Sequence, residues 1–166
     1  SQRRLCLLMA GPESGIDPML LNARLQPLTA QGLVQVVRRA EHVPQAEVGD
    51  YFSASDIVLA PYQRHLGSSN VLLLAAVHGR PALSQDYGLM GEYVRRHGLG
   101  LAVDTTRPSE IAAAIQRMLD RPGDFSPTSD TQALLRARHD ERCFAPAMLR
   151  RLATVRAPKA EQTARG

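Results

Sequence analysis

Tryptophan is absent from this sequence and the other aromatic residues are few, so that aromatics make up only 4% of the chain. Because proteins bind single-stranded nucleic acids largely by stacking bases on aromatic side chains, we do not expect a nucleic-acid partner. The two cysteines, Cys6 and Cys143, are too few for a disulfide framework or a cysteine metal cluster, which makes a reducing compartment such as the cytoplasm the default. Apolar runs are short, and none approaches the ~20 residues that span a bilayer.

The residues that are present are typical of a globular domain. The chain has 166 residues, of which 44% are hydrophobic and 22% are charged, enough for one domain with a core of its own. The formal net charge is +4, but residues 1–130 sum to −1 and residues 131–166 carry +5. Nineteen of the 20 basic residues are arginine, which is typical of a bacterial genome of high GC content.

Short apolar segments alternate with helical patterns along most of the chain. Strands are predicted at residues 5–9, 33–37, 57–60, 82–84 and 101–103. Helices are predicted at residues 18–31, from Pro44 onward, and at 71–77 (capped by Asn70), 90–97 and 109–119. This alternation predicts an α/β fold, a Rossmann-like parallel sheet of about five strands with helices on both faces. The predicted organisation is a core at residues 1–122, C-terminal helices at 123–156 that pack on it, and a frayed tail at 157–166.

The loop of residues 61–70 is the most informative candidate for a ligand site. Ligands of open parallel sheets bind beyond the carboxyl ends of the strands, near helix N-termini. Four residues stand directly before a buried helix, namely Gly67, Ser68, Ser69 and Asn70. The amides and dipole of that helix, together with two hydroxyl groups, suit a phosphate, although an ordinary serine-rich cap would need no ligand. His65 is a candidate donor to a phosphate or sugar, with simple solvent exposure as the alternative.

Other strand ends contribute weaker candidates. These are Gly11 and Pro12 after the first strand, His42 and Val43 after the second, and Tyr87, Gly88 and Gly91 after the fourth. The first segment lacks the G-x-G-x-x-G spacing of a dinucleotide site, and the glycines of the last could simply permit a tight turn. No nucleophile with an assignable base and no set of metal ligands is visible, so we expect no catalytic residue, metal or cofactor within the chain.

Three segments resemble glycosyltransferases of the GT-B type, group 1. Residues 51–62, YFSASDIVLAPY, are similar to the family's "y..aDv...PS" stretch. Residues 67–83, GSSNVLLLAAVHGRPAL, resemble its "EGFG...LEA.A.G.PV" motif, and residues 85–104 are similar to the segment that follows it. With the closing helices at 110–119 and 143–152, the resemblance covers roughly residues 5–155.

This resemblance implies the C-terminal, donor-binding half of a two-domain enzyme, in which a nucleotide-sugar substrate lies between two Rossmann-like domains. By motif position, Gly11 and Pro12 would approach the donor, His42–Pro44 would flank its base, and Gly67–Asn70 would hold its diphosphate. Tyr62 and His65 belong to the same donor-binding set.

The sequence departs from the family pattern in two ways. The family's paired glutamates correspond to Leu66 and Leu74, which cannot accept hydrogen bonds from the hydroxyls of a donor. The chain lacks the family's acceptor domain. It also lacks the strand and loop, expected before Leu5, that carry an Arg or Lys phosphate clamp, so we expect the chain alone to be inactive. The alternative that the two leucines suggest is a degenerate, non-catalytic Rossmann-like interaction module. We expect the basic residues 131–166 to face the missing domain or an anionic membrane surface of the cytoplasm.

Overall fold

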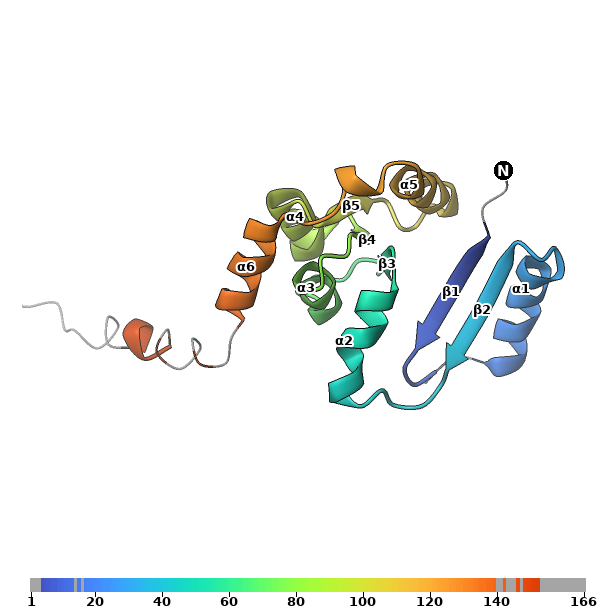
Figure 1. The fold of residues 1–166 in the computed structure, drawn as a ribbon, viewed down its shortest axis with the longest axis horizontal. Coiled ribbons are helices and arrows are strands. Elements are labelled where there is room, and N and C mark those ends of the chain that lie inside the picture. Colours follow the sequence, from blue (N-terminus) through green and yellow to red (C-terminus); the bar gives the residue numbers. More distant parts are fainter. Residues whose placement is uncertain are drawn as a thin grey trace, which may run out of the picture.

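The computed structural model describes residues 4–13, 15, 17–139, 142, 146 and 148–152, in which strands and helices alternate from the first strand onward (Figure 1). In chain order these elements are β1 (Leu5–Ala10), α1 (Pro18–Ala30), β2 (Val34–Arg39), α2 (Gln45–Ala54), β3 (Val58–Ala60), α3 (Asn70–Val77), β4 (Ala82–Gln85), α4 (Gly88–His97), β5 (Gly100–Val103) and α5 (Pro108–Asp120). The predicted α/β architecture, with parallel strands and intervening helices, is confirmed.

The five strands form two parallel sheets, where the sequence predicted one. β1 pairs with β2, with Leu5 opposite Val34, and the second sheet has the order β3-β4-β5, with Ala82 opposite both Val58 and Gly100. No strand pair joins the two sheets among the described residues. The difference arises because apolar spacing predicts how many strands form, whereas strand neighbours depend on contacts between distant segments.

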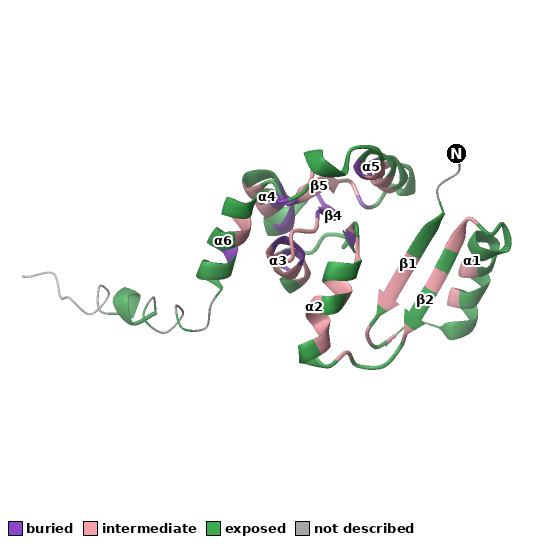
Figure 2. Ribbon diagram, viewed as in Figure 1, coloured by how far each residue is buried: buried purple, intermediate pink, exposed green. Residues whose placement is uncertain are grey.

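The buried core surrounds the three-stranded sheet, and all four residues of β4 are buried (Figure 2). Ala82 lies in a cluster with Leu72 of α3 and Met90 of α4, whereas Leu83 lies in a second cluster with Met118 of α5. Because successive side chains of a strand point to opposite faces, α3 and α4 cover one face of the sheet and α5 covers the other. Helices on both faces were predicted from the sequence.

The two-stranded sheet, in contrast, is poorly covered. No described residue before Val58 is buried, and Leu5 and Val37 keep about 40% of their surface exposed. Figure 2 shows β1, β2 and α1 only in the colours of half-buried and exposed residues. Parallel sheets normally bury both faces, so this apolar surface is unusual for such a sheet.

The start of α3 differs by one residue from its predicted start. Asn70 is the first helical residue, and the preceding Ser69 is the N-cap, since its Oγ accepts a hydrogen bond from the amide of Val71 at 3.2 Å. A serine in the extended conformation satisfies an otherwise unpaired amide of the first turn, which a helical asparagine does not do. The predicted end of α4 at residue 97 is confirmed, because the next residue, Gly98, adopts the left-handed conformation that ends a helix.

After α5 the chain forms a short 3-10 turn (Pro122–Asp124) at the predicted boundary between the core and the C-terminal helices, and then α6 (Ser129–Arg138). Leu135 of α6 joins the buried core, and the Arg136 guanidinium donates to the carbonyl of Val77 at 2.7 Å. The described residues do not include Cys143, residues 153–156 or the predicted tail at 157–166. Within the described part of the chain, no helix is long and apolar enough to cross a membrane.

Candidate functional site

The loop of residues 61–70, between β3 and α3, lies directly against the loop between β4 and α4. A Cβ atom added to Gly88 would stand 2.9 Å from the carbonyl oxygen of His65 and 3.5 Å from the Cα of Leu66. Gly88 also has a φ of +62°, so both its conformation and this close approach require glycine. The structure therefore brings together two of the loops that the sequence identified.

The N-terminus of α3 lies in this region with its cap already made. Ser69 is 7% exposed and caps the helix, whereas Ser68 and Asn70 beside it are exposed. Neither α3 nor α4 carries an acidic residue in its first turn, and Tyr87 at the start of α4 makes no side-chain cap. The positive ends of the two helix dipoles are thus uncompensated by carboxylates of their first turns, which favours an anion here.

The His65 ring lies between Tyr62 and the glycine of this loop. The Tyr62 and His65 rings lie 5.2 Å apart, centroid to centroid. A Cβ added to Gly67 would be 3.1 Å from the Nε2 atom of His65, so the imidazole packs over this glycine. Tyr62, His65 and Gly67, which the sequence placed in one set, are therefore neighbours.

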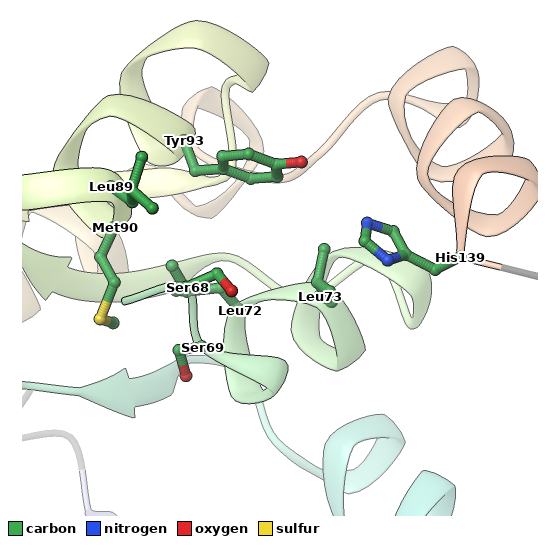
Figure 3. Close-up of a pocket in the computed structure, with 8 residues that line it drawn as sticks. All are labelled: Ser68, Ser69, Leu72, Leu73, Leu89, Met90, Tyr93 and His139. Carbon is green, nitrogen blue, oxygen red and sulfur yellow. The ribbon is translucent and has the colours of Figure 1, made fainter. Parts of the chain in front are cut away.

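A pocket of about 80 Å³ opens beside the N-terminus of α3 (Figure 3). It is lined by Ser68, Ser69, Leu72, Leu73, Leu89, Met90, Tyr93 and His139. In Figure 3, Met90 and His139 stand at opposite sides, with the two serines between them. Ligand pockets for molecules of nucleotide size measure roughly 300–1,000 Å³, so this hollow accommodates only a small part of such a molecule.

Gly91 lies within α4, and the four predicted residues that remain lie in the loops after the strands of the other sheet. Gly11 has a φ of +120°, and its amide donates to the carbonyl of Arg39 at 3.0 Å. Pro12 and His42 are exposed and Val43 is half-buried. These four residues follow β1 and β2, whereas the loop of residues 61–70 follows β3, a strand of the other sheet.

Two arginines hold the loops of the two-stranded sheet, and the sequence analysis did not identify them. Arg38 makes a bidentate contact with Glu13, with distances of 2.9 and 2.6 Å, and this hydrogen bonding lowers the pKa of the Glu13 carboxyl. Arg39 donates to Tyr51 and Glu47, whose hydrogen bonds raise the pKa of its guanidinium. The sequence indicated these two arginines only as charged residues at the end of an apolar strand.

Two buried polar residues were also not predicted from the sequence as part of the site. Gln85, at the end of β4, is 1% exposed, and Thr105, just after β5, is 4% exposed. Both side chains hydrogen-bond to the backbone of the 61–70 loop. The available signal for Gln85 was a pair of polar residues, Ser84 and Gln85, that ends a short strand. Among the described residues, no group of three or more histidine, cysteine, aspartate or glutamate residues is arranged to hold a metal ion.

The family model for group 1 glycosyl transferases matches residues 1–121 of this chain. Among individual proteins, a D-inositol 3-phosphate glycosyltransferase of Thermobispora bispora is 30% identical over 120 residues, which is 72% of this chain and 28% of that protein. Another, from Rhodococcus jostii, is 28% identical over 120 residues, or 72% of this chain and 26% of that protein. The chain thus spans less than a third of the length of these relatives.

Solved structures share the fold. The sucrose-phosphate synthase of Thermosynechococcus elongatus superposes with a TM-score of 0.70 at 18% identity, covering 92% of this chain and 38% of that one. Anabaena HepE, solved in complex with UDP, gives a TM-score of 0.66 at 14% identity, covering 92% of this chain and 49% of that one. At these identities the likeness concerns the fold, which includes both sheets of this chain.

Proposed function

This chain belongs to the group 1 glycosyltransferases, and from that premise we propose that it supplies the half of such an enzyme that binds a nucleotide-sugar donor. The observation that carries the proposal is the close packing of the 61–70 loop against the start of α4, beside the N-terminus of α3 and inside the segment that matches the family. This is the end of the sheet where parallel α/β folds bind their ligands.

In this proposal the diphosphate of the donor lies at the start of α3. The exposed Ser68 and Asn70 offer polar groups, and the first turn of α3, whose Val71 amide is held by Ser69, carries no competing carboxylate. His65, packed over Gly67, is placed to donate to a phosphate or sugar oxygen. Leu66 and Leu74 supply no hydrogen bonds to hydroxyl groups, so the diphosphate carries more of the recognition than the sugar does.

We further propose that an acceptor-binding half, outside these residues, completes the enzyme. Three observations support this: the chain spans 28% of the length of its relative, the pocket beside α3 is too small for a nucleotide-sugar, and the apolar two-stranded sheet buries no described residue. Group transfer needs the reacting molecules enclosed and oriented, so the chain alone would bind the donor without transferring its sugar.

Nucleoside diphosphates test this function directly. The structural neighbour HepE was solved in complex with UDP, so UDP is the first ligand to try, with GDP and ADP beside it. A ligand present at 100 times its dissociation constant should add about 2.7 kcal/mol to the free energy of unfolding. A chain whose melting temperature responds to none of the three at millimolar concentration would contradict the proposal.

A second candidate, a non-catalytic interaction module, is favoured by one specific observation. Leu66 is 68% exposed, and Leu89 and Tyr87, on either side of the Gly88 that lies against it, are 54% and 50% exposed. Apolar side chains gathered at a surface often mark a protein contact. Glycosyl transfer by the complete protein would remove this alternative, whereas an inactive complete protein that loses a partner on Leu66→Glu would support it.

A further inference from the structure

The segment of residues 61–66 contains an unusual backbone conformation. Arg64 has a φ of 55°, and no other non-glycine residue in the described ranges has a positive φ. Left-handed non-glycine residues are uncommon, and they persist where the surrounding structure determines their conformation. The segment on both sides of Arg64 is held by buried side chains that come from the ends of β4 and β5.

Gln85 holds the C-terminal side of this segment. Its Oε1 accepts from the amide of His65 at 3.0 Å, and its Nε2 donates to the carbonyl of the same residue at 2.5 Å and to that of Tyr87 at 2.9 Å. The His65 amide can only donate, which fixes the orientation of the side-chain amide. One buried side chain therefore ties the 61–70 loop to the start of α4.

Thr105 holds the N-terminal side. Its hydroxyl donates to the carbonyl of Tyr62, and its own carbonyl accepts from the Gln63 side chain at 3.3 Å. The residue is 4% exposed, so its hydroxyl is paired with the Tyr62 carbonyl and not with solvent. Together, Gln85 and Thr105 fix the backbone immediately before and after Arg64.

We propose that Gln85 and Thr105 are positioning residues that hold the 61–66 segment in its ligand-binding conformation and thereby set the affinity for a nucleoside diphosphate. The inference rests on the proposed function. A loop that is already ordered loses little conformational entropy when a ligand binds, whereas a loop freed from its anchors must be ordered at that moment. Because Gln85 also holds Tyr87, its loss would loosen both ligand loops at once.

Matched substitutions separate positioning from general stability. Thr105→Val removes the hydroxyl at nearly constant volume, and Thr105→Ser restores it. Gln85→Met keeps a side chain of similar length without its hydrogen bonds. The control is Gln132→Met, because Gln132 also donates to a backbone carbonyl, that of Pro127 at 3.1 Å, but lies in α6. The probe is UDP, titrated calorimetrically into the chain, with thermal unfolding measured in parallel.

We expect Thr105→Val and Gln85→Met to weaken UDP binding about tenfold or more, while Thr105→Ser and Gln132→Met bind as the unaltered chain does. If Gln85→Met does not fold, the comparison of Thr105→Val with Thr105→Ser decides. Equal UDP affinity in these two Thr105 variants would overturn the inference and leave the proposed function intact. Failure of the unaltered chain to bind UDP, GDP or ADP would refute both.

Discussion

The N-cap of α3 offers a substitution that separates its structural role from its proposed ligand role. Ser69 caps the helix through its Oγ atom, and aspartate and asparagine cap helices about as well as serine does. Ser69→Asp and Ser69→Asn should therefore both retain the cap, and they have nearly the same size. The two substituted side chains differ in charge: only aspartate adds a negative charge at the start of α3, where the proposed diphosphate binds.

The expected effect of this charge follows from the geometry of the cap. Ser69 Oγ lies 3.2 Å from the Val71 amide, and a phosphate oxygen bound to neighbouring amides of the same turn would lie about 4 Å from an aspartate carboxylate. Two unit charges at about 4 Å, near a protein surface, interact with roughly 4 kcal/mol. If salt screens half of this, the remaining 2 kcal/mol or so still weakens binding about 30-fold.

Isothermal titration with UDP, together with urea unfolding, provides the measurement. Ser69→Asn should bind UDP within a few-fold of the unaltered chain, and Ser69→Asp should bind about 30-fold more weakly or worse, with the difference shrinking as salt is added. Both variants should unfold at similar urea concentrations, because both retain the cap. Equal UDP affinity in the two variants would refute the placement of the diphosphate at the start of α3.

Three other predictions concern the scaffold. Gly91→Ala should destabilise the chain by about 3 kcal/mol in urea unfolding, because its Cβ would stand 2.1 Å from the carbonyl oxygen of Asp86. The control is Gly123→Ala, whose Cβ would meet nothing within 4 Å, and it should change stability by less than about 0.5 kcal/mol. Arg38 lowers the pKa of Glu13 in the folded chain, so this pair stabilises the fold above the carboxyl's usual pKa of 4.5 and ceases to do so as the pH falls through the lowered value. The difference in stability between the unaltered chain and Glu13→Gln should therefore vanish at acidic pH, and a constant difference would contradict the pairing. Amide hydrogen exchange of the exposed β1 and β2 should be faster in this chain than in the complete protein, and equal rates would argue against an acceptor half that covers them.

Local sequence patterns were sufficient to predict most of the elements. The α5 helix was predicted at 109–119 and lies at Pro108–Asp120, because its isoleucines, methionine and leucine recur at helical spacing. The strand predicted at 82–84 lies at Ala82–Gln85, and both of its faces are buried. Patterns of this kind depend on neighbours in the chain, which the sequence displays directly.

The division into two sheets and the anchors of the ligand loop could not be predicted in this way. Whether β1 pairs with β3 is decided by segments about 50 residues apart, and an apolar strand carries no mark of its neighbour. Gln85 bonds to His65, 20 residues away, and Thr105 bonds to Tyr62, 43 residues away. The sequence indicated a polar residue at a strand end, but its partner became visible only in three dimensions.

The cap of α3 shows how closely a sequence pattern can locate the start of a helix. The run of Ser68, Ser69 and Asn70 contains three residues that can each cap a helix, and the sequence analysis selected Asn70. The structure selects Ser69, whose backbone is extended with a ψ of 127°. A shift of one residue leaves the expected site in place, but it changes which side chain is already engaged before a ligand arrives.

An NMR titration of the chain with UDP shows whether a nucleoside diphosphate binds where the 61–70 loop meets the start of α4. We expect the largest chemical-shift changes at the amides of Ser69, Asn70 and Val71, with smaller ones at Tyr87 and Gly88. Shifts that saturate with UDP but are confined to β1, α1 and β2, or no shifts at millimolar UDP, would contradict it.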